Sequence, residues 1–159
     1  MSERMVIDAS VAAKWFLQDV MEADIDLADE ILVAFLSGDL ELHAPRIFTY
    51  EVCGLLTKAC RRRLLGANGF RVTKEQALRC AHELFSLSIH VAEATEAEGC
   101  EALGMAVDYS KKHYDMTYVR LAQHLDCQWC TADETADESV PPAFPRNHIL
   151  HLQALRPSP

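Results

Sequence analysis

The sequence predicts an α/β fold in which helices cover both faces of a mainly parallel sheet. Three observations predict it. Short apolar segments alternate with amphipathic helical segments, two helix starts carry capping boxes, and half of the residues are hydrophobic while a quarter are charged. Strands that alternate with helices pair in parallel through right-handed crossovers, and the helices then cover the sheet.

The first half of the chain predicts two strands, each followed by a helix. An apolar run at residues 5–8 precedes a helical segment at residues 11–17. A second helix spaces its apolar residues at i, i+4, i+7 and i+8 and stops at Ser37-Gly38, and the alternating residues 40–44 predict the next strand. Pro45 then opens a helix with an apolar stripe, which consists of Phe48, Val52, Leu55, Leu56 and Ala59.

The second half continues the same alternation after a break at Gly66–Gly69. Capping boxes at Thr73–Gln76 and Thr95–Glu98 mark two helices, with a strand at residues 88–92 between them. Further along, the sequence predicts a helix at residues 114–125, a strand at 127–132, a Pro-rich loop at 140–145 and a last strand at 149–152.

The length of the chain favours one domain. With 159 residues it can bury one sizeable core, so we expect a single domain over residues 1–152 and a disordered tail over residues 153–159. No apolar run is long enough to cross a bilayer, and residues 1–5 lack the layout of a secretory signal. We therefore expect a cytoplasmic protein with no membrane partner. In that compartment thiols are reduced, so the six cysteines, including the Cys127–Cys130 pair, are expected to be packing thiols.

Four acidic residues stand inside or at the end of apolar segments, where hydrophobic surroundings disfavour an unpaired carboxylate. Asp8 ends the first strand and Asp133 follows the fourth, Glu51 lies in the early turns of the helix after the second strand, and Asp115 lies in the first turn of the helix before the fourth. The C-terminal ends of parallel strands lie along one edge of a sheet, where open α/β folds bind ligands. We therefore expect the four carboxylates to converge at that edge.

Helical spacing places the two helix-borne acids on inward faces. Glu51 lies three residues after Phe48 and four before Leu55, and Asp115 shares its face with Tyr118. Carboxylates that converge repel one another unless divalent cations neutralise them. Ligand sets made only of oxygen suit Mg²⁺ or Mn²⁺, so the pattern predicts a site for one of these ions.

Each acid taken alone has a structural alternative. Asp8 could cap the helix that begins near Ser10, Asp133 could begin a turn, and Asp115 could complement a helix dipole. Glu51 is too deep in its helix to be a cap. The coincidence of four acids on one edge favours the metal site.

The four acidic segments resemble, in order, the motifs of PIN-domain ribonucleases. They are Val6–Ser10, Tyr50–Val52, Tyr114–Ala122 and Thr131–Asp133, and the likeness spans about residues 5–152. Within that group the chain is most similar to the small VapC-type toxins of prokaryotic toxin–antitoxin pairs. The resemblance implies a three-layer α/β/α sandwich.

The resemblance also implies roles for individual residues. It puts Asp8, Glu51, Asp115 and Asp133 in a catalytic quartet that binds metal, and it matches Ser10 and Thr131 to hydroxyl positions that support the acids through hydrogen bonds. The implied activity is an endoribonuclease that uses Mg²⁺ or Mn²⁺ to hydrolyse phosphodiester bonds in RNA. The implied partners are an RNA substrate, a cognate antitoxin and a second copy of the chain in a homodimer. Whether one or two ions bind stays open.

Basic side chains for an RNA backbone are scarce. The chain has 15 Lys and Arg against 24 Asp and Glu, a net charge of −9, so RNA would have to be held by local basic groups or by cations. The candidates are Lys14 in the first helix and the run Arg61, Arg62 and Arg63, with Arg71, Lys74, Lys111 and Lys112 more remote. For Trp15, Trp129 and Tyr118 we expect core packing rather than stacking on bases.

Other functions fit parts of the pattern. A haloacid-dehalogenase-like phosphatase requires Asp-x-Asp after the first strand, whereas this chain has Asp8-Ala9-Ser10. A receiver-like domain requires a further acidic pair, which the sequence lacks. A PIN-type RNA-processing nuclease outside any toxin pair and a PIN-like module that only binds protein remain alternatives, although protein binding alone does not require inward carboxylates.

Overall fold

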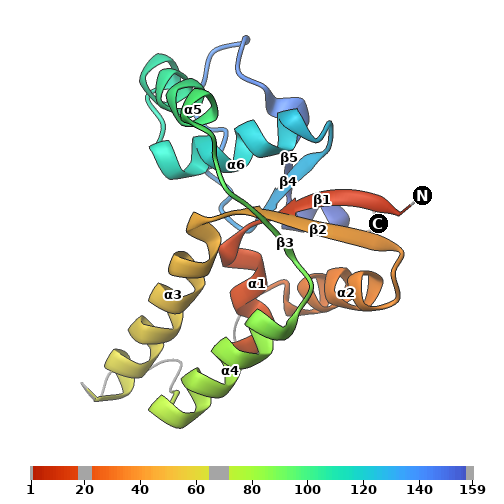
Figure 1. Ribbon diagram of the computed structural model, residues 1–159, viewed down its shortest axis with the longest axis vertical. Helices are drawn as coiled ribbons and strands as arrows, with labels where there is room; N and C mark the ends of the chain where they lie inside the picture. Colours follow the sequence, from red (N-terminus) through yellow and green to blue (C-terminus); the bar gives the residue numbers. More distant parts are fainter. Residues whose placement is uncertain (1, 18–22, 65–71, 157–159) are drawn as a thin grey trace.

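The computed structural model describes residues 2–17, 23–64 and 72–156, and these residues form one central sheet with helices on both faces (Figure 1). The sheet has five strands in the order β3-β2-β1-β4-β5, and every neighbouring pair is parallel. The strands are β1 Glu3–Ile7, β2 Leu40–Pro45, β3 His90–Ala92, β4 Gln128–Thr131 and β5 Ile149–His151. The predicted parallel sheet is confirmed, and β1 occupies its centre.

The helices form two layers. Figure 1 shows α1 to α4 on one side of the sheet and α5 and α6 on the other. The described helices are α1 Ala9–Phe16, α2 Ile25–Leu36, α3 Ile47–Leu64, α4 Lys74–Ser86, α5 Glu96–Tyr109 and α6 His113–His124. The structure therefore confirms the three-layer α/β/α sandwich.

The core lies on both faces of the central strands. Val6 and Ile7 of β1 point to opposite faces and are both fully buried, as expected for a parallel strand covered on two sides. The apolar stripe of α3 packs against the lower face, where Phe48 and Val52 are buried, and α6 buries Val119 against the upper face. Burial of each such side chain stabilises the fold by about 1.5–3 kcal/mol.

The helix ends follow the expected local chemistry. Both capping boxes are present, because Thr73 and Thr95 each accept from the backbone N–H three residues on and receive the reciprocal bond from Gln76 or Glu98. The end of α2 is also as predicted, since Gly38 follows Ser37 with a φ of +82°, which favours glycine. The predicted break at Gly66–Gly69 lies outside the described residues.

The chain after β5 differs in part from the disordered tail that we expected. Residues 152–155 form a short 3-10 helix, and Arg156 forms an ion pair of 2.6 Å with Asp24. Residues 153–156 are therefore attached to the start of α2, while residues 157–159 lie outside the described part of the chain.

The cysteines and the helices also answer two sequence questions. All six cysteines are free, and burial raises the pKa of the Cys130 thiol to about 12, which suits a packing thiol rather than a reactive one. Among the described residues, no helix has both the length and the apolar character needed to cross a bilayer.

Candidate active site

Asp8 stands at the junction of the central strand β1 and helix α1. It is the N-cap of α1, because Oδ2 accepts from the backbone N–H of Ser10 at 3.0 Å. The hydroxyl of Ser10 donates to the same oxygen, and the indole Nε1–H of Trp129 donates to Oδ1 at 3.2 Å. The capping role that was weighed against a metal role is therefore real, and it fixes the carboxylate at the C-terminal edge of the sheet.

Glu51 reaches the same edge from the second turn of α3. Its Oε2 accepts from the hydroxyl of Tyr118 at 2.5 Å, across 67 positions of sequence. The Tyr118 ring stacks on the Trp129 ring with centroids 5.5 Å apart. Both rings are buried, as predicted for core packing, but the polar atoms of both rings also bind acidic residues, which was not predicted.

Asp115 and Asp133 complete the set from α6 and the end of β4. Asp133 Oδ1 accepts from the backbone N–H and the hydroxyl of Thr135, at 2.9 and 2.7 Å, so this acid also makes the local turn that was its structural alternative. Asp115 lies in the first turn of α6, and within the described residues no hydrogen bond or ion pair holds its carboxylate.

The four carboxylates line one cavity of about 340 Å³. Four separate segments supply them, and the cavity lies at the edge where β1 and β4 end, as the sequence predicted. The remaining lining residues are Ala9, Ser10, Gly54, Leu55, Lys58, Trp129 and Thr131. The cavity contains neither cysteine nor histidine, so its ligand atoms are hard oxygens.

The two hydroxyl positions lie where they can support the acids. Ser10 donates to Asp8, and its Oγ accepts from the backbone N–H of Ala132 at 3.1 Å, which ties the start of α1 to the end of β4. Thr131 is fully buried and accepts from the backbone N–H of Asp133 at 3.1 Å. Both side chains therefore hold the segments that carry Asp8 and Asp133.

Burial and mutual repulsion act on the charges of the cavity. Burial is the main cause that raises the pKa values of Asp8, Glu51 and Asp115, and repulsion between these acids adds to it. The pKa of Asp133 is lowered instead, chiefly by the Thr135 hydrogen bond. Among the described residues none of the four forms an ion pair with lysine or arginine, so most of this charge lacks direct compensation.

The donor set fits a hydrated Mg²⁺ or Mn²⁺ ion better than a closed cage. No group of three or more acidic, histidine or cysteine side chains in the described ranges is close enough to enclose a single ion. Mg²⁺ keeps several water ligands and is usually held by one or two carboxylates together with substrate phosphates. Carboxylates spread around one cavity suit that mode of binding.

The basic residues differ from the sequence interpretation. Lys14 is only 7% exposed and its Nζ donates to the carbonyl of Ala23 at 3.0 Å, so it does not reach the cavity as we had suggested. Arg61 is exposed on α3, and the side chains of Arg62 and Arg63 lie outside the described part. Lys58, which we had not singled out, lines the cavity. It could have been found, because positions 51, 55 and 58 share one helical face.

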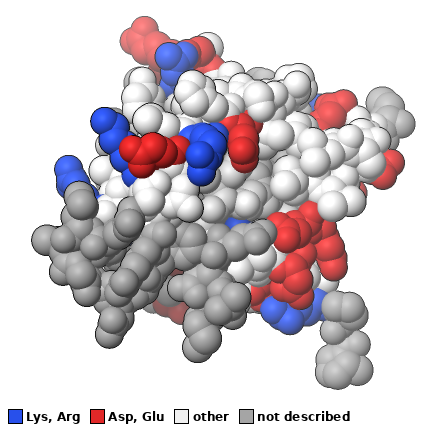
Figure 2. Space-filling model, turned by 90° about the horizontal axis from the view of Figure 1, so that it is seen from below, with Lys and Arg blue, Asp and Glu red and all other residues white. Residues whose placement is uncertain are grey.

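Two other lysines act on the cavity from its rim. Lys112 favours the charged forms of Glu51, Asp115 and Asp133, and Lys111 favours those of Asp115 and Asp133. Elsewhere positive charge is dispersed: on the face seen in Figure 2, the visible blue residues lie among red ones and do not merge into one basic surface.

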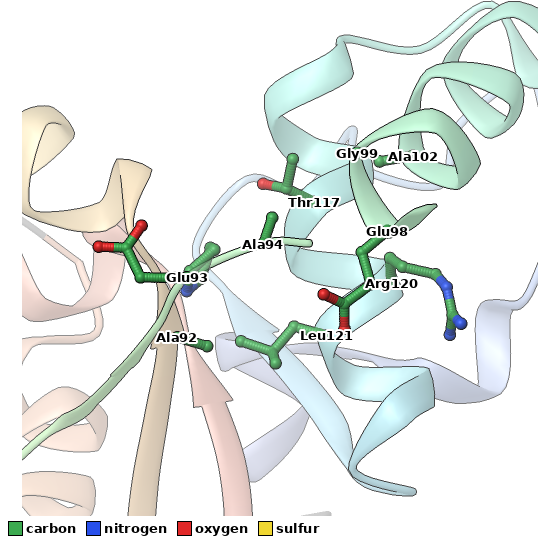
Figure 3. Close-up of a pocket in the computed structure, with 10 residues that line it drawn as sticks. Ala92, Glu93, Ala94, Glu98, Gly99, Ala102, Thr117, Arg120 and Leu121 are labelled. Carbon is green, nitrogen blue, oxygen red and sulfur yellow. The ribbon is translucent and has the colours of Figure 1, made fainter. Parts of the chain in front are cut away.

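A second, smaller cavity of about 50 Å³ lies between the segment after β3 and helices α5 and α6 (Figure 3). Its charged side chains have partners of opposite sign, since Arg120 pairs with Glu101 and Glu93 pairs with Arg46. Glu98 accepts from the backbone N–H of Thr95. This cavity is too small for a nucleotide, and its charges already neutralise one another.

The arrangement of strands and helices is shared with proteins of known structure. No family model and no curated protein matches the sequence. The structure is similar to VapC20 of Mycobacterium tuberculosis, described as a sarcin-ricin loop cleaving toxin, with a TM-score of 0.58 and 15% identity over 80% of this chain and 87% of that one. The chain has a PIN-like fold.

A second solved structure agrees with the PIN-like fold over more of the chain. The protein PAE2754 of Pyrobaculum aerophilum matches with a TM-score of 0.64 and 22% identity, over 96% of this chain and 86% of that one. At these identities the similarity concerns the path of the backbone. The chemistry of the site therefore has to be argued from its own side chains.

Proposed function

We propose that the protein is an endoribonuclease that depends on Mg²⁺ or Mn²⁺ and hydrolyses phosphodiester bonds in RNA at the acidic cavity. The observation that carries this proposal is the convergence of Asp8, Glu51, Asp115 and Asp133, from four separate segments, on one cavity at the C-terminal edge of a PIN-like sheet. Buried carboxylates without cationic partners destabilise a protein unless a ligand uses them, and a divalent cation is the ligand that they suit.

The residues of the cavity would divide the work as follows. Bound there, Mg²⁺ or Mn²⁺ supplies Lewis-acid stabilisation of the scissile phosphate and activation of water. The four carboxylates hold the cation, and Ser10 and Thr131 keep the segments that carry Asp8 and Asp133 in place. No side-chain nucleophile is needed, and the only hydroxyl close to Asp8, that of Ser10, is already engaged in two hydrogen bonds.

Lysines at the cavity supply the positive charge that the rest of the surface lacks. Lys58 lines the cavity two turns beyond Glu51 on α3, and Lys112 and Lys111 lie on its opposite side, at the start of α6. An RNA backbone that crosses the cavity would pass between these two groups. Short-range attraction of this kind is compatible with a net charge of −9, because salt screens distant charges.

The biological role that we propose is the toxin of a toxin–antitoxin pair. The similarity in fold to a toxin, VapC20, supports it. A cognate antitoxin, a homodimer and a cytoplasmic location belong to the same proposal. An RNA-processing nuclease outside any pair would have the same cavity, so the role needs a test separate from that of the chemistry.

The chemistry is tested by cleavage of a generic single-stranded RNA in Mg²⁺, in Mn²⁺ and in excess chelator. We expect the parent protein to cleave only with a divalent ion, and Asp8→Asn to be inactive although folded. Asp108→Asn, an exposed acid on α5, is the matched control and should cleave like the parent. Equal activity of Asp8→Asn and the parent would dismiss the nuclease proposal, and inactivity of every variant would favour the protein-binding alternative.

The toxin role is tested by controlled expression in a bacterial host. Expression of the parent should arrest growth, and expression of Asp8→Asn should not. Cleavage in vitro without growth arrest would favour the RNA-processing alternative. Sequencing of the RNA ends that accumulate during the arrest would identify the cut site.

A further inference from the structure

Two buried aromatic residues connect all four segments that carry the acids. Trp129 of β4 donates from Nε1–H to Asp8 Oδ1 at 3.2 Å, and Tyr118 of α6 donates from its hydroxyl to Glu51 Oε2 at 2.5 Å. The two rings stack with an interplanar angle of 20°. Asp115 lies one turn before Tyr118 on α6, and Asp133 lies four residues after Trp129, so the stacked pair joins every acid-bearing segment.

Both aromatic residues can act only as donors toward the acids. An indole has a single N–H and no acceptor. The pKa of Tyr118 is raised, first by burial and then by the nearby Asp8 and Glu51 charges, so its hydroxyl keeps its proton at every physiological pH. Each bond therefore fixes one oxygen of a carboxylate and leaves lone pairs on that side chain free for another ligand.

The two aromatic residues are also rigid in position. Tyr118 is 1% exposed and Trp129 is 2% exposed, and both pack in the core between the sheet and α6. A donor fixed by packing holds its carboxylate in one orientation, which lowers the cost of ordering that carboxylate when a cation binds.

We propose that Tyr118 and Trp129 are positioning residues of the acidic cavity, which orient Glu51 and Asp8 for the divalent cation and couple them through the ring stack. This inference rests on the proposed function. It differs from a simple packing role because the hydroxyl and the indole N–H, rather than the volumes of the rings, are responsible for the effect.

Tyr118→Phe and Trp129→Phe remove the two donors, and two matched controls exist in the same core. Tyr109 donates from its hydroxyl to the carbonyl of Ala143 at 3.3 Å and meets Phe144 edge to face, and Trp15 donates to the carbonyl of Ala28 at 2.8 Å. Tyr109→Phe and Trp15→Phe therefore remove the same groups from places that do not touch the acids.

The measurement is Mn²⁺ binding by titration calorimetry on the full chain. We expect Tyr118→Phe and Trp129→Phe each to weaken Mn²⁺ binding about 10-fold, the usual effect when a group that orients a metal ligand is lost. Tyr109→Phe and Trp15→Phe should bind like the parent. The double variant Tyr118→Phe/Trp129→Phe should lose less than the product of the single losses, because the stack couples the two bonds.

A spectroscopic measurement locates the ion independently. Tb³⁺ bound in the cavity should emit when tryptophan is excited, because the Trp129 indole touches Asp8. The emission should persist in Trp15→Phe and vanish in Trp129→Phe. In Tyr118→Phe, which keeps Trp129, a titration of this emission should show the same weakening as the calorimetry. Emission that survives Trp129→Phe would place the ion elsewhere and overturn the inference.

The outcomes separate the inference from the proposed function. If Asp8→Asn abolishes Mn²⁺ binding while Tyr118→Phe and Trp129→Phe bind like the parent, the positioning role is wrong and the metal site stands. If the parent binds no Mn²⁺, both are wrong. If the parent binds Mn²⁺ as described but cleaves no RNA, the nuclease proposal fails and the positioning role stands. Thermal unfolding in chelator identifies any variant that has lost its fold.

Discussion

The two cavities of the molecule treat charge in opposite ways. Around the small cavity of Figure 3, Arg120 and Glu93 are paired with side chains of opposite sign, so the charges cancel inside the protein. In the acidic cavity the carboxylates receive hydrogen bonds from neutral donors such as Ser10, Tyr118 and Trp129, which orient them without cancelling their charge. Charge that the protein does not neutralise itself is available to a ligand, and this contrast distinguishes the candidate active site.

The largest expected difference between the two cavities is in RNA cleavage. Glu51→Gln removes a charge from the acidic cavity, and Glu101→Gln removes a charge from the pair with Arg120 beside the small one. We expect the first substitution to lower the rate of Mn²⁺-dependent RNA cleavage on the order of 100-fold or more, as for the loss of one electrostatic partner of a transition state. The second should leave the rate unchanged. Similar losses in both variants would remove the functional distinction between the cavities.

Removal of metal should change stability next most strongly. A ligand that binds only the folded state stabilises it by about 2.7 kcal/mol when present at 100 times its Kd. We therefore expect the melting temperature of the parent to rise in Mn²⁺ and to return to its starting value in excess chelator. Asp8→Asn should show no such rise, whereas Glu101→Gln should respond like the parent. Differential scanning fluorimetry measures this directly.

Neutralisation of a cavity acid should stabilise the metal-free protein. The raised pKa of Asp115 means that its protonated form is favoured by folding, so its contribution is fully present below the unfolded pKa and is lost as pH rises through the folded value. Asp8 and Glu51 follow the same sign, while Asp133, with a lowered pKa, follows the opposite one. We expect Asp115→Asn to stabilise the protein in chelator at pH 7 by about 1 kcal/mol.

Urea unfolding between pH 4 and pH 8 tests the sign as well as the size of this effect. The gain from Asp115→Asn should shrink toward pH 4, where the carboxyl of the parent is itself protonated. Glu98→Gln is the useful opposite, because that carboxylate accepts from the backbone N–H of Thr95 and its pKa is lowered. Its loss should destabilise the protein at pH 7. Destabilisation by both substitutions would mean that the cavity acids are not repelling one another.

The smallest expected effect concerns the positive rim of the acidic cavity. Lys58→Gln should weaken RNA binding and reduce the slope of log affinity against log salt by about 0.7, the value for one phosphate contact on a single strand. Lys74→Gln, on α4 in a different groove, should leave the slope unchanged. Binding measured by fluorescence polarisation of Asp8→Asn with each substitution avoids cleavage during the titration.

Much of the fold could be predicted from the sequence because its signals are local. The capping boxes at Thr73 and Thr95 and the stop at Ser37-Gly38 depend on residues within one turn of each other, and the structure confirms all three. The apolar runs at residues 5–8 and 40–44 likewise predicted the strands β1 and β2 to within two residues. Hydrophobic periodicity sets such elements before any tertiary contact is made.

The candidate site could be predicted only in part, because contacts between distant residues carry no local signal. The four acids followed from the rule that ligands bind at the C-terminal ends of parallel strands. Lys58 shares a helical face with Glu51 and was within reach of the same reasoning. The donation from Tyr118 to Glu51 spans 67 positions, and nothing in either segment reveals it. Lys14 was misplaced for the same reason, since its burial depends on how α1 packs beside Ala23.

The central place of β1 has a consequence for how the protein is made. Asp8 is among the first residues to leave the ribosome, yet β1 has β4 as one of its two neighbours, and β4 begins at Gln128. Until that late segment emerges, the nascent chain carries three of its four acids but has no edge along which to gather them. A translation product that stops before residue 128 would therefore be harmless, and the chain acquires its chemistry only when synthesis is nearly finished.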